Sequence, residues 1–288
     1  MRAIECTGDT DLLLNNLDIS LQNGEKENEC ISIQEKDLLQ QLKLENKKVN
    51  MMSKTEISLK INKEKIEPIL KEETIKSIES QKLDKAPGSD LITNELLKTT
   101  LPVMIPRLTN LFNEILETET IPEDWTKSTI ILLHKKGDKE DIGNYRPISL
   151  TSNIYKIFSK IILNRITNTL DENQPKEQAG FRSKFSTIDH IHTLRQILQK
   201  YSEYNKTYHI GFVDFNKAFD TLEHDYIWDA MNRQGVQEKY IRIIKNVYTA
   251  STAKVKLEYE SSEFPIKRDV RQGDPISPKI FSAVLEMI

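Results

Sequence analysis

The sequence predicts an α+β protein that is mostly helical and carries short antiparallel hairpins. Long stretches repeat apolar residues at helical spacing, and shorter β-branched runs that end in turn residues lie between them. Charged side chains make up 30% and hydrophobic side chains 38% of the 288 residues, which is the balance of an ordinary globular protein. We therefore expect a packed domain over most of the chain.

The first 65 residues differ from the rest. They are rich in Asn, Gln, Lys and Glu and poor in aromatic residues, and only Leu38, Leu39 and Leu42 suggest a weak helical stretch. A segment of this composition has too little apolar surface to fold alone. The sequence predicts a flexible charged arm over residues 1–65 and a folded domain over residues 66–288.

Apolar stripes predict the helices of the domain, and we expect these stripes to form its core. The expected helices cover residues 66–83, 101–116, 154–170, 188–201, 226–231 and 240–248. Strands are expected at residues 128–133, from residue 146 onward, at 210–213, and as a hairpin at 253–259 and 264–270. Lys156 and Lys160 fall on the polar side of the third helix.

Asp214 is the most informative candidate for chemistry. It ends the β-leaning run Ile210–Val213, and a turn then leads through Phe219 and Asp220 toward a helix. A carboxylate at a strand end suits Mg²⁺, which prefers oxygen ligands and is usually held by one or two carboxylates plus substrate phosphates. The alternative is a turn-former or helix cap, which is the role that we assign to Asp220.

A basic hairpin precedes this strand. Its loop, His134–Asp138, carries the ammonium groups of Lys135 and Lys136, and the returning strand carries Arg146. A guanidinium can bind phosphate oxygens bidentately, whereas lysine offers a flexible point charge. The alternative is a solvated turn without function.

Two further turns are expected to lie close to a ligand. Gln178–Arg182 presents an aromatic side chain and a cation, and Arg271–Pro275 contains Gly273, which permits close backbone approach. Ser277 and Pro278 then favour the cap and start of a helix.

Together with Lys85–Lys98, these stretches resemble the reverse transcriptase domain of LINE-type (non-LTR) retrotransposons and, more loosely, group II intron reverse transcriptases. The resemblance covers about residues 66–288, with YRPISL, QAGFR, VDFNKAFD and RQGDP in the order of the family. It implies the fingers and an incomplete palm of a right-hand polymerase, without a thumb. It also implies an RNA-directed DNA polymerase that uses Mg²⁺, an RNA template, a DNA primer and deoxynucleoside triphosphates in a two-metal mechanism.

The resemblance assigns roles to individual residues. Asp214 and the backbone carbonyl of Phe215 would bind metal, with Asp214 as the catalytic carboxylate. The nucleotide would be held by Lys135 (or Lys136), Arg146, Phe219 beneath its sugar, Gln272 and Gly273. The template would contact Arg182, Lys156 and Lys160.

The sequence also departs from the family. The catalytic Asp-Asp dipeptide, expected after the helix that starts at Ser277, is absent from the sequence, so we expect this chain to be inactive alone. Leu91 and Asp269 stand where the family usually has glycine. Two alternatives therefore remain open: a non-catalytic nucleic-acid-binding relic of a retroelement, and an inert relic that folds poorly.

Charge and cysteine content set further bounds. The net charge is -3, but residues 155–200 hold 8 basic and 4 acidic side chains, which suits a moderate basic stripe along a phosphate backbone. Cys6 and Cys30 predict neither a disulfide nor a zinc site, and the histidines lack ligand spacing. No apolar run is long enough to span a membrane. We expect an intracellular protein of the nucleus or cytoplasm.

Overall fold

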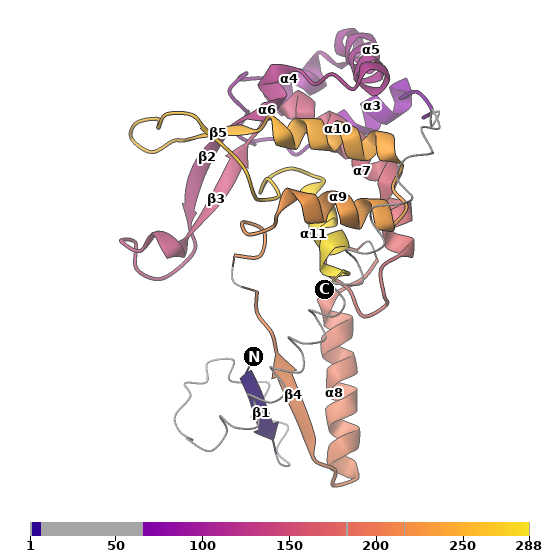
Figure 1. Ribbon diagram of the computed structural model, residues 1–288, viewed down its shortest axis with the longest axis vertical. Coiled ribbons are helices and arrows are strands. Elements are labelled where there is room, and N and C mark those ends of the chain that lie inside the picture. Colours follow the sequence, from indigo (N-terminus) through magenta and orange to yellow (C-terminus); the bar gives the residue numbers. More distant parts are fainter. Residues whose placement is uncertain (1, 7–65, 183, 216, 288) are drawn as a thin grey trace, which may run out of the picture. The chain divides into compact units, whose positions relative to one another are not determined.

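The computed structural model describes residues 2–6, 66–182, 184–215 and 217–287 (Figure 1). The chain divides into two compact units, one of residues 1–2, 64–196 and 211–288 and the other of residues 3–63 and 197–210. The larger unit contains the helices α3 (Lys71–Glu79), α4 (Asn94–Thr99), α5 (Leu101–Thr118), α6 (Glu123–Thr126), α7 (Asn153–Glu172), α9 (His224–Arg233), α10 (Glu238–Thr249) and α11 (Ser277–Leu285).

The larger unit also contains a four-stranded sheet of order β3-β2-β5-β6. Its strands are β2 (Lys127–His134), β3 (Tyr145–Leu150), β5 (Thr252–Val255) and β6 (Phe264–Pro265). The predicted antiparallel pairing of β2 with β3 is confirmed, with Leu133 opposite Arg146. The second hairpin is much shorter than predicted. The sequence did not predict that β2 and β5 pair in parallel, which joins the two antiparallel hairpins into one mixed sheet.

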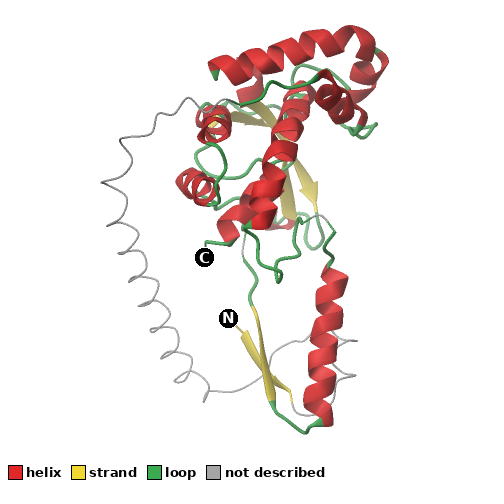
Figure 2. Cartoon of the chain, turned by 90° about the vertical axis from the view of Figure 1, so that its right-hand side faces the viewer, coloured by secondary structure: helices red, strands yellow, loops and turns green. Residues whose placement is uncertain are grey.

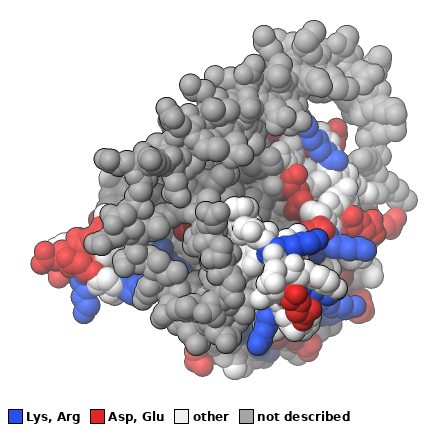
Figure 3. Space-filling view, turned by 90° about the horizontal axis from the view of Figure 1, so that it is seen from below, with Lys and Arg blue, Asp and Glu red and all other residues white. Residues whose placement is uncertain are grey.

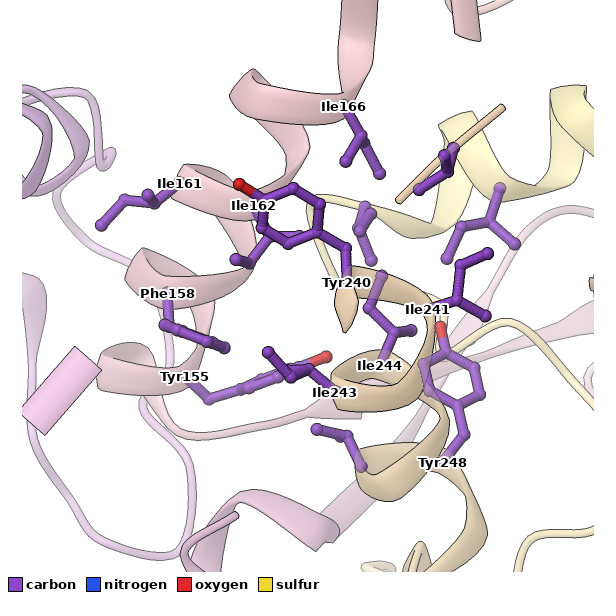
Figure 4. Close-up of a cluster of buried hydrophobic side chains, with 14 of the residues drawn as sticks. Tyr155, Phe158, Ile161, Ile162, Ile166, Tyr240, Ile241, Ile243, Ile244 and Tyr248 are labelled. Atoms are coloured by element: carbon purple, nitrogen blue, oxygen red, sulfur yellow. The ribbon is translucent and has the colours of Figure 1, made fainter. Parts of the chain in front are cut away.

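Helices α7 and α10 form much of the hydrophobic core. Their apolar side chains face one another in Figure 4, and most of the apolar residues of α7 predicted to point inward are buried, with Ile154 only partly so. Phe112 of α5 joins this core and packs against the rings of Trp125 and Phe158. Figures 1 and 2 show the helices of this unit gathered beside the sheet.

Helix α3 is shorter than predicted. It begins at Lys71 and ends at Glu79, whereas the apolar pattern suggested residues 66–83. Pro68 disfavours helical backbone in the residue before it. The backbone N–H of Ile69 instead donates to the Asn113 side chain at 2.7 Å, which holds the approach to α3 in an extended form.

Helix α8 (Thr187–Glu203) was predicted correctly, but its predicted role in the core is wrong. None of its described residues is buried, and Ile188 is 71% and Ile191 57% exposed. Helical spacing establishes that apolar residues share a face. Burial of that face requires a packing partner, which periodicity cannot supply.

The smaller unit includes the end of α8 and most of β4 (Tyr208–Phe212), the strand predicted at residues 210–213. Strand β4 pairs with β1 (Arg2–Cys6), a strand that the sequence did not predict within the arm. The rest of the arm, with the helical stretch at Leu38–Leu42 and with Cys30, lies outside the described residues. Among the described helices, none is both long and apolar enough to traverse a lipid bilayer.

Candidate nucleotide-binding site

The basic hairpin exposes its cations. Lys135, Lys136 and Arg146 are all exposed, and within the described part of the chain no hydrogen bond or ion pair engages their charged groups. The Lys135 backbone N–H donates to the Asn144 carbonyl at 2.8 Å, so the start of the loop is fixed while its side chains stay in solvent. Exposed, unpaired cations retain their full charge for an anionic ligand.

The turn that follows β6 lies directly against this hairpin. The Ser149 backbone N–H of β3 donates to the Gln272 carbonyl at 2.8 Å. Gly273 has φ +122°, and a Cβ atom there would lie 2.8 Å from the Ser149 carbonyl oxygen. Only glycine fits this contact. The structure thus brings the predicted residues Gln272 and Gly273 beside the strand that carries Arg146.

Arg271 precedes this turn and is 1% exposed. Its guanidinium donates to the carbonyls of Trp125 at 2.9 Å and Thr126 at 3.0 Å, and to the Ser251 hydroxyl. The rings of Tyr155 and Tyr248 lie on it, each with its centroid 5.6 Å away. A buried guanidinium held by carbonyls and aromatic rings is suited to holding a turn in place.

Asp274 anchors the other end of the turn and is 3% exposed. Its carboxylate accepts hydrogen bonds from the hydroxyls of Tyr155 and Ser159 on α7 and from the Ile276 backbone N–H at 3.2 Å. Burial and the neighbouring carboxylate raise the pKa of the Tyr155 phenol, which therefore stays a donor. Sequence reasoning missed the roles of Arg271 and Asp274, because nothing in the motif reveals that their side chains are buried.

Ser277 does not cap α11 as predicted. It is the first helical residue, Ile276 is the cap, and Pro278 lies in the first turn. The Ser277 hydroxyl donates instead to the Arg271 carbonyl at 2.9 Å. The start of α11 therefore adds a further contact to the same turn.

Asp214 and Phe215 follow the end of β4 and are exposed. Phe219 is half-buried, with its ring stacked on Phe281 at 4.5 Å and edge-on to Phe181 at 6.1 Å. Phe181 is itself exposed, as predicted, and has φ +56°. The structure thus places Phe219 in an aromatic cluster whose outer member, Phe181, is open to solvent.

Residues 268–270 connect the Phe219 segment to the turn. The Asp269 backbone N–H donates to the Leu222 carbonyl at 3.0 Å, and that of Val270 donates to the Phe219 carbonyl at 3.4 Å. Arg268 and Glu223 form a β-bridge and an ion pair. These contacts place Phe219 and Gln272 at the two ends of one short connector.

Asp220 lies in the turn beside this connector. The prediction that Asp220 caps the next helix is wrong, because α9 starts at His224 with Glu223 as its cap. Burial of Asp269, and then the charge of Asp220 nearby, raise the pKa of Asp269 to about 7.

The predicted template residues are less free than expected. Lys156 is half-buried against Asn153, and burial lowers its pKa. Arg182 donates to the carbonyls of Pro175 and Asp171 at the end of α7 and stacks on Phe185. Lys160 is half-buried. On the face drawn in Figure 3, acidic side chains lie among the basic ones.

The donor atoms that the chain offers determine whether it could hold a metal ion. Among the described residues there is no group of three or more His, Cys, Asp or Glu side chains placed to hold a metal ion. Asp214 offers one exposed carboxylate and Phe215 a carbonyl, which are the hard oxygen donors that Mg²⁺ prefers. They fit part of a cation site, with the remaining ligands left to phosphate oxygens.

Comparisons with known proteins identify a matching family and several relatives. Residues 133–288 match the family described as reverse transcriptase (RNA-dependent DNA polymerase). The chain is 33% identical over 224 residues to a probable RNA-directed DNA polymerase from transposon BS of Drosophila melanogaster, an overlap of 75% of this chain and 24% of that protein.

Two further retroelement proteins are similar to this chain. The RNA-directed DNA polymerase from mobile element jockey of Drosophila melanogaster is 32% identical over 69% of this chain and 22% of its own length. The retrovirus-related Pol polyprotein from type-1 retrotransposable element R2 of Popillia japonica is 31% identical over 76% of this chain and 30% of its own length. The chain thus spans only about a quarter of these curated relatives.

Proposed function

Because this chain belongs to the reverse transcriptase (RNA-dependent DNA polymerase) family, we propose that it forms the fingers and part of the palm of an RNA-directed DNA polymerase and binds the incoming nucleotide. The observation that carries the proposal is the hydrogen bond from the Ser149 N–H to the Gln272 carbonyl at 2.8 Å. It joins the turn containing Gly273 to the strand that bears Arg146. Two segments far apart in the sequence therefore form one surface.

On this surface the charges suit a triphosphate. Arg146 presents two parallel N–H donors to phosphate oxygens, and Lys135, or Lys136 in its place, adds an ammonium from the loop. Gly273 lets the backbone approach the nucleotide, and Gln272 offers an amide to its base or sugar. Phe219 lies beneath the sugar, with Phe281 fixing the plane of its ring.

The metal is proposed to be Mg²⁺. Asp214 and the Phe215 carbonyl would supply two oxygen ligands, and the ion would neutralise developing charge on the phosphates. Asp214 is exposed, so its carboxylate is accessible to an ion that arrives with a nucleotide. An RNA template and a DNA primer are the proposed partners.

Primer extension on an RNA template with Mg²⁺ tests this proposal. The 288-residue chain is compared with a fusion that carries the segment following the aligned region in the jockey relative. We expect no extension by the chain alone and extension by the fusion, because a single metal carboxylate does not complete a two-metal site.

Matched variants of the fusion make the test specific. Asp214→Ala should abolish extension, whereas Asp225→Ala, which removes an exposed carboxylate in the first turn of α9, should preserve it. A folded fusion that never extends a primer would discard the polymerase proposal. Salt-sensitive binding of an RNA–DNA hybrid by such a fusion would instead favour a non-catalytic nucleic-acid binder.

A further inference from the structure

We infer that Arg271 is a positioning residue, which fixes the Gln272–Gly273 backbone against β3 and so sets the spacing between the groups that hold the nucleotide. The expected effect of Arg271 on nucleotide binding rests on the proposed function. The positioning of the Gln272–Gly273 backbone rests on the contacts that Arg271 makes.

Arg271 joins elements that are distant in the sequence. It donates to carbonyls at the junction of α6 and β2, to the Val247 carbonyl at 3.4 Å and to the Ser251 hydroxyl at the end of α10. Its guanidinium also lies over the rings of Tyr155 of α7 and Tyr248 of α10, 5.6 Å from each centroid. Hydrogen bonds from both terminal nitrogens leave the planar group little freedom to move.

The residue that follows Arg271 makes the contact with β3. Gln272 accepts from the Ser149 N–H, and Gly273 lies so close to Ser149 that no side chain fits between them. Asp274 then returns the chain to α7 through Tyr155 and Ser159. The two residues that touch β3 are therefore held between two buried, hydrogen-bonded charges.

On the N-terminal side of Arg271, residues 268–270 connect it to the segment that contains Phe219. The Val270 N–H donates to the Phe219 carbonyl at 3.4 Å, and the Asp269 N–H to the Leu222 carbonyl at 3.0 Å. A shift of Arg271 would move Phe219 relative to Gln272 and Arg146. Misplacement of binding groups by about 1 Å is enough to weaken a reaction strongly.

A purely structural role for Arg271 would be to fill the core, and Lys279 provides the control for that role. Lys279 is also buried, at 4% exposure, and is paired with Asp171 on α7. Its side chain donates hydrogen bonds to Asp171 and Gln174, away from the turn. If Arg271 only fills the core, Arg271→Met and Lys279→Met should have the same local effects at equal loss of stability.

Amide hydrogen exchange of the full chain, measured by NMR, separates the two roles. At denaturant concentrations that equalise the free energy of unfolding, Arg271→Met should speed exchange at the Ser149 and Asp269 amides about tenfold relative to the Lys135 amide. Lys279→Met should leave that ratio unchanged. Equal ratios in the two variants would overturn the inference.

Milder variants guard against simple unfolding of Arg271→Met. Arg271→Lys keeps the charge but not the planar group, and Tyr155→Phe removes one donor to Asp274. Both variants should lose protection selectively at the Ser149 and Asp269 amides, and the loss should be smaller for Tyr155→Phe. Preserved protection at Ser149 in both variants would contradict a positioning role.

Binding of Mg·dATP, followed by titration, links the turn to the proposed function. The wild-type chain and Lys279→Met should bind alike, and Arg271→Lys about tenfold more weakly. If the wild-type chain does not bind the nucleotide, the proposed function fails, while the exchange result still decides the role of Arg271.

Discussion

At the scale of single residues, Asp269 has an unfavourable environment in several respects. Its φ is +107°, a conformation that favours glycine. Its Oδ1 atom is buried and has no hydrogen-bond partner among the described residues. Burial, followed by the charge of Asp220, raises its pKa to about 7. The resemblance to the family predicts a glycine at this position, and the structure offers a physical reason, because an aspartate with this backbone conformation and burial costs stability.

Replacing Asp269 should make the protein more stable at neutral pH. The folded-state pKa is above the ordinary value of 3.8, so the folded form holds its proton while the unfolded chain loses it. Wild-type stability should therefore fall as pH rises from about 4 to about 7, by roughly 2–4 kcal/mol, and stay low above that. Denaturant unfolding of wild type and Asp269→Asn across this range measures the difference.

The difference in unfolding free energy between wild type and Asp269→Asn isolates the titration of Asp269, because the other titrating groups contribute equally to both proteins. Burial lowers the pKa of His224, which contacts the backbone carbonyl of residue 269. Both proteins keep this contact, so the contribution of His224 to the pH dependence disappears on subtraction. Asp269→Gly should gain more than Asp269→Asn, since it also relieves the backbone strain, by about 1 kcal/mol or more. Parallel pH profiles for wild type and Asp269→Asn would contradict the raised pKa.

Gly273 should tolerate no side chain. Gly273→Ala places a Cβ atom 2.8 Å from the Ser149 carbonyl at φ +122°, and we expect a loss of roughly 2–4 kcal/mol in the free energy of unfolding. Gly211→Ala is the control, because no atom lies within 4 Å of its Cβ position. Equal unfolding midpoints for both variants would disprove the close contact.

At the scale of elements, Arg165 fastens α3 to α7. Its guanidinium donates to both carboxylate oxygens of Glu73 and to the backbone carbonyls of Glu67 and Pro68. The same bonds lower the pKa of Glu73. One side chain thus satisfies the extended lead into α3, where the sequence pattern alone predicted helix.

Arg165→Met should therefore destabilise the protein by about 1.5–3 kcal/mol, since the half-buried Glu73 carboxylate and the buried Tyr240 hydroxyl lose their donor. Arg242→Met is the comparison. Arg242 forms ion pairs with Glu119 and Glu238 but is 49% exposed, and exposed pairs contribute only about 0–1 kcal/mol. Chemical unfolding that shows similar losses for the two variants would argue against the fastening role.

At the scale of the whole molecule, the parallel contact of β2 with β5 unites two hairpins into one sheet. The turn at residues 271–274 then protects the outer edge of β3 through Ser149. The chain thereby holds the exposed cations of the hairpin at a fixed place relative to the turn. Any nucleic acid that uses this surface should be attracted mainly through its phosphates.

Binding of an RNA–DNA hybrid should accordingly weaken steeply as salt rises. We expect Lys135→Ala combined with Arg146→Ala to reduce the slope of log affinity against log salt by about 1–2, because each lost phosphate contact releases about one counterion fewer. Lys239→Ala with Lys245→Ala on α10 removes equal charge away from the hairpin. Fluorescence anisotropy at several salt concentrations distinguishes the pairs, and equal slopes would exclude the hairpin as a phosphate site.

The sequence predicted much of the local structure. Hairpin β2–β3, the helices α5, α7, α9 and α10, and most of their buried stripes follow from periodicity. The motif order identified a reverse transcriptase domain of non-LTR retrotransposon type, which the family match and the similar relatives together confirm. The metal and template roles, the nuclear or cytoplasmic location and the boundary at residue 65 remain predictions. Local patterns sufficed because apolar spacing and turn residues act within a few positions of the chain.

Only the tertiary structure decided which faces and charges are buried. Helix α8 has an apolar stripe that stays exposed, whereas Arg271 and Asp274 carry charges that the fold encloses. The parallel strand contact and the close approach of Gly273 to Ser149 join residues more than a hundred positions apart. Burial depends on the partner that long-range packing supplies, and no local pattern in the chain encodes that partner.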